Sequence, residues 1–187
     1  MSSDSQTTKA LFSRLEQCML ADRRSLSKKL YGLSHRLKQK KPIDRSLSQL
    51  SKDIEASASR FLLRQSNRPH PTYPEDLPVS GRRDEIAEAI TKHQVVIIAG
   101  ETGSGKTTQI PKICLELGRG IAGQIGHTQP RRIAARAVTT RISQEMGSKL
   151  GEHVGFMVRF PVKSKKSSYI MLITEVLMLA EFQSDPL

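Results

Sequence analysis

The sequence has little of what builds disulfide or metal frameworks. It contains no tryptophan, three tyrosines, five phenylalanines and only two cysteines among 187 residues. Cys18 and Cys114 lie far apart and form no CxxC pair, so their spacing supports neither a zinc cluster nor a disulfide. The five histidines are scattered without the short spacing that zinc ligands need. We therefore expect reduced, inert thiols and no metal cluster.

Long apolar runs and acidic residues are also scarce. No apolar run approaches the roughly 20 residues of a membrane span, and the polar start over residues 1–6 lacks the apolar core of a signal peptide. We therefore expect a cytoplasmic protein without a membrane partner. With 30 Lys or Arg against 18 Asp or Glu, the net charge is +12 and the pI is near 10.0. This balance favours a polyanionic partner, nucleic acid before an anionic membrane, although a solvated basic surface has the same composition.

The amino-terminal region, residues 1–64, has the apolar spacing of helices. Apolar residues recur in three groups: Leu11, Leu15 and Cys18; Leu26, Leu30, Leu33 and Leu37; Leu47, Leu50, Ile54 and Phe61. This pattern predicts three amphipathic helices, with breaks near Asp22 and at Lys40-Lys41-Pro42, where the proline disfavours helical geometry in the preceding residue. Residues 22–41 hold eight Lys or Arg against one Asp. That density suits a phosphate backbone but is equally common on exposed helix faces.

A change of composition divides the chain. Residues 65–78 contain four prolines and almost no apolar periodicity, which predicts a linker between residues 1–64 and a domain over 79–187. In that domain, Ser80 can cap a helix that runs through Ile90. Strands are expected near 94–99, where the β-branched run suits a strand buried on both faces, and near 122–128 and 169–174. The alternation of strands with helices is typical of an α/β fold with a parallel sheet.

The strongest motif directly follows the first expected strand. Gly-Glu-Thr-Gly-Ser-Gly-Lys-Thr at 100–107 matches GxxxxGK[ST] at every fixed position. The glycines let successive backbone N–H groups point inward at a helix N-terminus, where they bind phosphate. Lys106 can reach the β- and γ-phosphates, and the Thr107 hydroxyl can bind Mg²⁺. We expect a nucleoside triphosphate at Gly100, Glu101, Thr102, Gly103, Ser104, Gly105, Lys106, Thr107 and Thr108. A glycine-rich turn without a ligand is the structural alternative.

Further motifs carry a family likeness. The loop at 100–108, extended by a second threonine and followed by Thr-Gln-Pro-Arg-Arg-Ile-Ala-Ala at 128–135, resembles the DEAH-box RNA helicases. Leu-Pro-Val-Ser at 77–80, Val-Gly-Phe-Met-Val-Arg-Phe at 154–160 and the basic amino-terminal helices are similar to the bacterial HrpA-type members. The resemblance implies a partial RecA-like P-loop NTPase domain over 79–187 that binds ATP and Mg²⁺, preceded by the all-α helical region. It also implies single-stranded RNA as the partner, with ribosome-associated RNA as one option, and leaves the oligomeric state open.

The resemblance also assigns RNA contacts. In the family, the segment that matches residues 128–132 lies along the bound strand and contacts its backbone. The corresponding residues are Thr128, Gln129, Arg131 and Arg132, with Arg159 and Thr174 as further candidates. Independently, a Thr-Gln-Pro-Arg-Arg turn after a strand places two guanidiniums and a hydroxyl at the carboxyl edge of the sheet, where open α/β sheets bind ligands. Solvated surface arginines are the alternative, and Arg159 would equally suit a surface salt bridge.

Two departures from the family pattern bear on activity. Thr174-Glu175-Val176 stands where the family usually has Thr-Asp-Gly, so the glycine that eases a strand-to-helix turn is missing. The sequence also ends at Leu187, before the Asp-Glu-Ala-His, Ser-Ala-Thr and second-lobe segments on which hydrolysis depends. We therefore expect this chain alone to be inactive, marginally stable and at most a weak binder of nucleotide and RNA. ATP-driven RNA unwinding would belong to the complete protein.

Two other functions remain open. A truncated, non-catalytic nucleotide- and RNA-binding protein would bind both ligands without releasing phosphate. An unrelated P-loop kinase or transporter ATPase would need a separate acceptor site or a signature segment, and we recognise neither in the sequence.

Overall fold

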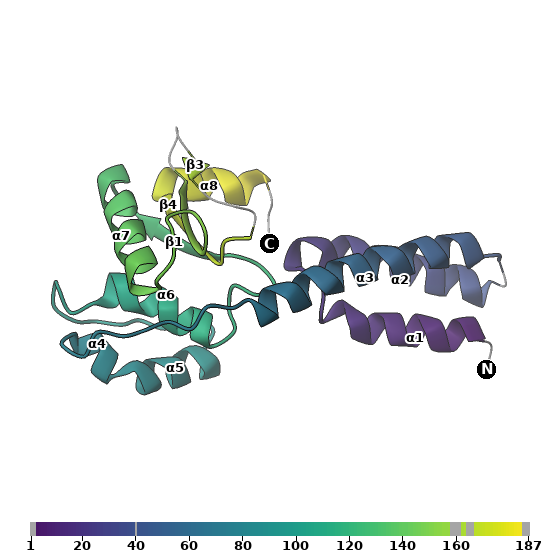
Figure 1. Cartoon of the computed structure of the whole chain (residues 1–187). Helices are drawn as coiled ribbons and strands as arrows, with labels where there is room; N and C mark the ends of the chain where they lie inside the picture. Colours follow the sequence, from purple (N-terminus) through teal and green to yellow (C-terminus); the bar gives the residue numbers. More distant parts are fainter. Residues whose placement is uncertain (1–2, 40, 158–161, 164–166, 185–187) are drawn as a thin grey trace. The chain divides into compact units, whose positions relative to one another are not determined.

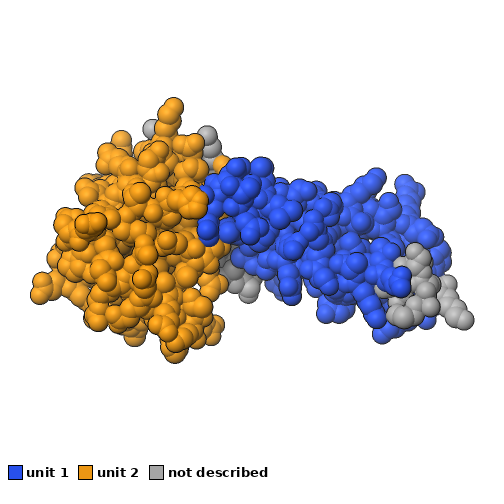
Figure 2. All heavy atoms as spheres, turned by 60° about the horizontal axis from the view of Figure 1, so that its bottom comes forward, with its two compact units in different colours: residues 1–68, 121–123 blue, residues 69–120, 124–187 orange. Residues whose placement is uncertain are grey.

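The computed structural model describes residues 3–39, 41–157, 162–163 and 167–184, which form two compact units. Unit 1 comprises residues 1–68 together with 121–123, and unit 2 comprises residues 69–120 and 124–187 (Figure 2). None of the described helices has the length and apolar character needed to cross a bilayer.

Unit 1 is a bundle of three helices; the apolar spacing predicts the three helices, and the structure shows how they pack. Its helices are α1 (Ser3–Leu15), α2 (Leu20–Lys38) and α3 (Asp44–Ser66) (Figure 1). They pack around a core in which Cys18, Leu30, Ile54 and Ala58 are fully buried. The expected break near Asp22 is displaced, because α1 and α2 separate at residues 16–19. Asp22 lies instead in the first turn of α2, where a carboxylate is favoured by the helix dipole.

The segment 121–123 belongs to unit 1 although it follows α6 in the chain. The N–H of Leu20 at the start of α2 donates to the Ala122 carbonyl at 2.8 Å, and Nε of Arg64 donates to the Ile121 carbonyl at 2.8 Å. A helix N-terminus leaves N–H groups without intrahelical partners, and the segment satisfies one of them. Ile121 is buried as well, so this segment completes the helical unit.

Unit 2 is a small α/β unit of helices and a sheet (Figure 1). The strands of the sheet lie in the order β1-β4-β2-β3. Its strands are β1 (Ile125–Gln129), β2 (Val154–Met157), β3 (Val162–Lys163) and β4 (Ile170–Thr174). Strands β1, β4 and β2 are parallel, and β3 runs antiparallel to β2. Its helices are α4 (Pro78–Gly81), α5 (Arg83–Lys92), α6 (Lys106–Glu116), α7 (Arg132–Glu145) and α8 (Glu175–Ser184).

The strands expected near 122–128 and 169–174 are confirmed as β1 and β4, whereas β2 and β3 were not anticipated. The central strand β4 is almost wholly buried, with Ile170 and Leu172 fully inaccessible. Leu115 of α6 and Ile142 of α7 join the same core. A central parallel strand covered on both faces accounts for its continuous apolar sequence.

The strand expected at 94–99 is absent. This segment has no regular secondary structure, and the side chains of Val95 and Ile97 are 79% and 92% exposed. A strand exists only when a neighbour accepts and donates its ladder hydrogen bonds, and the described part of the sheet provides none here. The β-branched run therefore indicates a preference for extended backbone, but it does not determine whether the segment pairs with another strand.

The single helix expected from Ser80 to Ile90 is instead two helices, α4 and α5. Pro78 is in the first turn of α4, the position where a missing N–H costs least. Ser80 does not act as a cap, because its hydroxyl is buried inside α4 and has no hydrogen-bond partner among the described residues. The two helices meet at Arg82.

Residues 69–77 lie against helices of unit 2. The Thr72 hydroxyl donates to the Glu145 carbonyl of α7 at 2.6 Å, and the Tyr73 hydroxyl donates to the Glu116 carboxylate of α6 at 2.9 Å. Tyr73 also has the cations of Lys112 and Arg83 over its ring, 4.9 and 5.2 Å from the centroid. This proline-containing segment is therefore held against the helices of unit 2 through Thr72 and Tyr73.

Candidate nucleotide site and nucleic-acid edge

The glycine-rich loop joins the extended segment 94–99 to helix α6. Gly103 and Gly105 both have a left-handed backbone, with φ of 87° and 93°. Gly105 is the N-cap of α6, so the loop ends where the unpaired N–H groups of a helix N-terminus collect. The predicted phosphate-binding residues thus lie on one loop and the first turn of one helix.

Gly105 also packs closely against two side chains, those of Leu77 and Gln109. A Cβ at this position would lie 3.0 Å from Leu77 Cδ1 and 3.2 Å from Gln109 Cγ. The N–H of Val79 donates to the Ser104 carbonyl at 3.1 Å. The Leu-Pro-Val-Ser segment therefore supports the loop, and residue 105 has to be glycine both for its backbone conformation and for its space.

Lys106 is folded onto the loop. Its Nζ donates to the carbonyl oxygens of Gly100 and Glu101, each at 2.6 Å, and to Ser104 Oγ at 3.1 Å. Ser104 Oγ donates in turn to the Glu101 carbonyl at 2.9 Å. A phosphate could take over the ammonium, because a charged acceptor makes a stronger hydrogen bond than a carbonyl. The Thr107 side chain is exposed at the start of α6.

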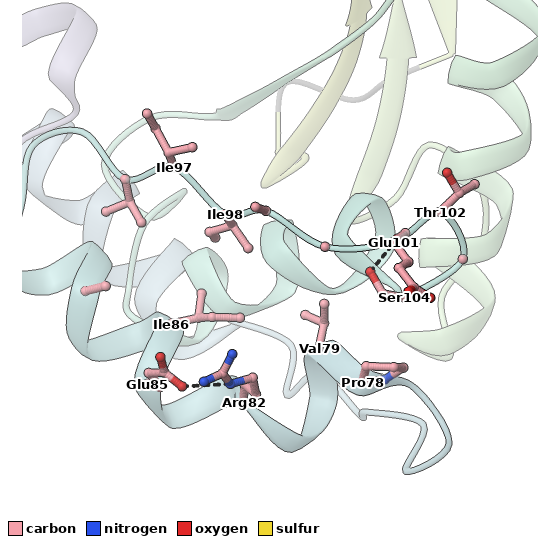
Figure 3. A pocket seen from close by; sticks show the side chains of 15 residues that line it. Pro78, Val79, Arg82, Glu85, Ile86, Ile97, Ile98, Glu101, Thr102 and Ser104 are labelled. Atoms are coloured by element: carbon pink, nitrogen blue, oxygen red, sulfur yellow. Dashed lines mark hydrogen bonds and ion pairs between the residues drawn. The ribbon is translucent and has the colours of Figure 1, made fainter.

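Two cavities border the loop. The larger, about 660 Å³, lies between α4, α5 and residues 96–104, and Figure 3 shows its aliphatic side chains Val79, Ile86 and Ile98. The smaller, about 460 Å³, is lined by Leu77, residues 102–108, Arg141 and Glu145. The smaller cavity fits a phosphate chain better, because Lys106, Thr107 and the N-terminus of α6 line it, whereas the larger cavity is lined by neither Lys106 nor Thr107.

A buried ion pair next to the smaller cavity joins α6 to α7. Lys112 is fully buried, and its Nζ donates to Glu145 Oε2 and to the Thr72 carbonyl, both at 2.6 Å. Glu145 also accepts from Gln109 at 3.0 Å and from Arg141 at 2.6 Å. Burial by itself would raise the pKa of Glu145, but these donors outweigh it and lower that pKa. Burial lowers the pKa of Lys112, with Glu145 opposing the shift.

Sequence reasoning missed Arg141 and Glu145 as residues of this cavity. Their spacing of four on a helix was visible and predicts the pairing of their side chains. The spacing does not predict that α7 packs beside α6. That packing places both residues next to the glycine-rich loop. Arg141 keeps 61% of its side chain exposed, so it can reach a ligand in the cavity while it remains paired with Glu145.

The predicted RNA-contact residues gather at the carboxyl edge of the sheet. Because β1 and β4 pair in parallel, Gln129 stands opposite Thr174. Arg131 is the N-cap of α7, and Arg132 is its first residue. Thr128 lies one position before Gln129 on β1. We call these five residues the sheet edge.

The sheet edge is open to solvent. Thr128, Arg131 and Arg132 are exposed, while Gln129 is half-buried with its Nε2 2.9 Å from His127 Nε2. The missing glycine after Thr174 does not prevent a tight turn, because β4 ends at Thr174 and α8 begins at the next residue. The remaining candidate, Arg159, lies outside the described residues. Across the described parts of the chain, no group of three or more His, Cys, Asp or Glu could hold a metal ion.

Comparisons with known proteins agree with this layout. Residues 6–65 match the family model of the HrpA N-terminal alpha helical hairpin binding domain. The chain is 48% identical over 97% of its length to the ATP-dependent RNA helicase HrpA of Escherichia coli, and 46% identical over 94% to the HrpA homolog of Haemophilus influenzae. It is 45% identical over 59% of its length to the ATP-dependent RNA helicase DEAH13 of Arabidopsis thaliana, of which it covers 9%.

A solved structure extends the likeness to the fold. The crystal structure of the Escherichia coli DEAH/RHA helicase HrpB matches 59% of this chain with a TM-score of 0.55 and 30% identity, and the match covers 14% of that protein. The chain spans 14% of the length of each of the two bacterial HrpA relatives.

Together, these matches show that the chain corresponds in sequence to the amino-terminal region of DEAH-box RNA helicases. Within that class, the relatives it matches over almost its whole length are of the HrpA type.

Proposed function

We propose that this chain is the ATP-binding and RNA-contacting front of an ATP-dependent RNA helicase, and that unit 2 is part of a RecA-like P-loop domain. The observation that carries the proposal is the glycine-rich loop itself. Two left-handed glycines lead into the N-terminus of α6, and Lys106 lies over the loop beside a cavity of about 460 Å³. This combination of donors is suited to a triphosphate.

The residues present fit ATP and Mg²⁺ in their chemistry. The N–H groups at the start of α6 and the Lys106 ammonium would hold the phosphates, with the rest of the loop from Gly100 to Thr108 around them. Thr107 would supply a hydroxyl oxygen to Mg²⁺, which prefers oxygen ligands and neutralises phosphate charge when bound. Arg141 adds a second cation on the cavity wall. The proposed ligand is therefore ATP with Mg²⁺.

The sheet edge is the proposed RNA contact. Arg131 and Arg132 present exposed guanidiniums, and Thr128 and Thr174 present hydroxyls on adjacent strands. Groups of this kind contact phosphate oxygens and sugars and position a strand without reading its bases. We therefore propose single-stranded RNA as the partner, bound through its backbone.

Binding without turnover is the outcome we expect of this chain by itself. Hydrolysis requires a group that orients water and further groups that stabilise the transferring phosphoryl. Glu145 is the one carboxylate among the described residues that line the smaller cavity. Its oxygens already accept hydrogen bonds from Lys112, Arg141 and Gln109. Unwinding and hydrolysis are accordingly proposed for a longer protein that contains this segment.

The nucleotide proposal is tested by titrating the chain with a fluorescent ATP analogue and Mg²⁺ while phosphate release is measured with and without single-stranded RNA. Lys106→Ala should abolish binding, whereas the exposed Lys149→Ala should leave it unchanged, because Lys149 lies on the loop after α7. Equal binding by wild type and Lys106→Ala would refute the site. RNA-stimulated phosphate release by this chain would refute the expectation of binding without turnover.

The RNA proposal is tested separately by fluorescence anisotropy with a labelled single-stranded RNA. The double variant Arg131→Ala/Arg132→Ala should weaken binding. It should also make the slope of log affinity against log salt concentration shallower, as expected for the loss of about two phosphate contacts. Arg136→Ala is the control, because Arg136 is exposed one turn further along α7. If the control lowers the affinity as much as the double variant, the sheet edge is not the contact.

A further inference from the structure

Positive charge is concentrated in unit 1, which contains none of the residues of the proposed function. Residues 1–68 contain 15 Lys or Arg and 6 Asp or Glu, so they carry nine of the twelve excess positive charges in 187 residues. An uneven distribution of this kind indicates a surface for a polyanion better than the net charge does.

Part of this charge forms a stripe along α2. Arg24, Lys28, Tyr31, His35 and Lys38 follow one another at intervals of four, three, four and three residues. That spacing places all five on one side of the helix, over about 21 Å at 1.5 Å per residue. All five side chains are exposed. We call them the basic stripe.

The apolar side of α2 is already occupied. Leu26, Leu30 and Leu33 are 5%, 0% and 7% exposed and belong to the core of unit 1. A basic amphipathic helix binds a membrane, or the groove of a partner, through its apolar side. Since α2 buries that side within the bundle, the basic stripe can bind a partner only through its charged, polar and aromatic side chains.

The cations of the basic stripe are not neutralised within the bundle. Acidic residues of unit 1 form ion pairs elsewhere: Asp53 with Lys29, Asp22 with Arg60, and Glu55 with Arg14. Among the described residues, no acidic side chain pairs with Arg24, Lys28 or Lys38. These three cations are therefore available to an external anion.

Tyr31 at the centre of the basic stripe is a large exposed aromatic side chain in a chain with few aromatics. Its side chain is 65% exposed. Its ring centroid lies 4.9 Å from that of Phe12, at an interplanar angle of 59°, and Phe12 packs against the core. Phe12 thus supports the ring on one side while most of it faces solvent. A supported aromatic ring between cations is the arrangement on which nucleobases stack.

We propose that the basic stripe of α2 is a second binding surface for single-stranded RNA, separate from the sheet edge. Arg24, Lys28 and Lys38 contact phosphates, and Tyr31 stacks with a base. Single-stranded RNA suits the basic stripe better than duplex RNA, because stacking on a side chain requires an unpaired base. The proposal goes beyond the ATP site and the sheet edge, and it does not require either of them.

The test is anisotropy of a labelled single-stranded RNA against the full chain with three variants. Tyr31→Ala should weaken binding about fivefold or more, since loss of one stacked base has at least this effect, whereas Tyr31→Phe should retain it. Lys28→Glu should weaken binding more than Lys52→Glu, which makes the same charge change at an exposed position on α3. Circular dichroism of each variant verifies that the bundle is folded.

Several outcomes overturn the proposal. Equal losses with Lys28→Glu and Lys52→Glu, together with no effect of Tyr31→Ala, would show that unit 1 attracts RNA only through its overall charge. Variants of the basic stripe that weaken binding to anionic lipid vesicles but not to RNA would assign it to a membrane surface. In the same assay, Arg131→Ala/Arg132→Ala reports on the sheet edge, so failure of one surface is distinguishable from failure of the other.

Discussion

At the scale of single residues, Gly105 is the position on which the loop geometry depends. Its φ of 93° costs an L-residue about 1–2 kcal/mol, and a Cβ would lie 3.0 Å from Leu77 Cδ1. Gly105→Ala should therefore weaken binding of the fluorescent ATP analogue at least tenfold. Gly81→Ala is the matched control, because a Cβ there has no atom within 4 Å. Similar affinities of the two variants would show that the loop tolerates a side chain.

Lys112 and Glu145 form the buried pair that fixes α6 against α7. Removing one partner of such a pair leaves an uncompensated buried charge, which typically destabilises a protein by about 3–5 kcal/mol. We expect Lys112→Ala to lower the free energy of unfolding by an amount of this order, measured by urea denaturation. Lys149→Ala, at an exposed position, should change it by less than about 0.5 kcal/mol. A small effect of Lys112→Ala would mean that the pair contributes little to the packing.

The same pair predicts acid sensitivity. The pKa of Glu145 is lowered in the folded state, so its stabilising contribution is complete above the ordinary carboxyl pKa of 4.5 and is lost as the pH falls through the lower folded value. Between pH 7 and pH 3, the wild type should therefore lose more unfolding free energy than Glu145→Gln, which has no carboxylate to protonate. Parallel losses in urea denaturation at both pH values would contradict this assignment.

Residues close in sequence could be assigned to a site before the structure was known, and distant ones could not. The loop from Gly100 to Thr108 is a continuous pattern in which each residue type has a chemical reason. The contact between Lys112 and Glu145 joins positions 33 residues apart, and neither residue type is unusual in a helix. Only the packing of α6 beside α7 brings them together.

At the scale of elements, the difference between β4 and the segment 94–99 shows the limit of local sequence. Both are short apolar runs, and both were predicted as strands. Residues 170–174 are paired on both sides, with β1 and β2, whereas 94–99 has no paired neighbour in the described structure. Apolar β-branched residues favour an extended backbone, but tertiary pairing decides whether a strand forms. Helices depend less on distant partners, which is why the spacing of α1 to α3 was predicted more accurately.

The unpaired segment 94–99 should promote self-association. It exposes Val95 and Ile97 next to backbone groups without ladder partners, which favours pairing with another chain. Ile97→Lys should therefore reduce the fraction of oligomer in sedimentation velocity experiments at increasing concentration. Ile133→Lys is the control, because Ile133 is 85% exposed but lies on helix α7, where helical geometry does not offer a strand edge. Equal reductions by both variants would point to general hydrophobicity rather than to the unpaired backbone.

Helix α2 contains a glycine that the fold does not require. A Cβ at Gly32 would meet no atom within 4 Å, and the residue lies inside the helix. Replacement of an exposed helical glycine by alanine stabilises by about 0.5–1 kcal/mol. We expect Gly32→Ala to raise the free energy of unfolding by this amount in urea denaturation. A loss of stability would mean that Gly32 has a packing role that the open space does not reveal.

At the scale of the whole molecule, charge and chemistry are divided between two units. Unit 1 holds nine of the twelve excess positive charges and the basic stripe, while unit 2 holds the glycine-rich loop and the sheet edge. The sequence predicts a helical region and an α/β domain, from helical spacing on one side and strand-helix alternation on the other. It did not predict that residues 121–123 would complete unit 1, because that contact spans 57 residues, from Arg64 to Ile121.

The most direct test of the central proposal, that this chain folds into a nucleotide-binding unit, is the stabilisation of the folded state by ATP and Mg²⁺. A ligand that binds only the folded state at 100 times its Kd adds about 2.7 kcal/mol to the free energy of unfolding. We predict stabilisation of this order for the wild type and for Lys149→Ala, measured by urea denaturation with Mg²⁺ alone as the reference. We predict none for Lys106→Ala. Absence of stabilisation in the wild type, or the same stabilisation in Lys106→Ala, would contradict the proposed nucleotide site.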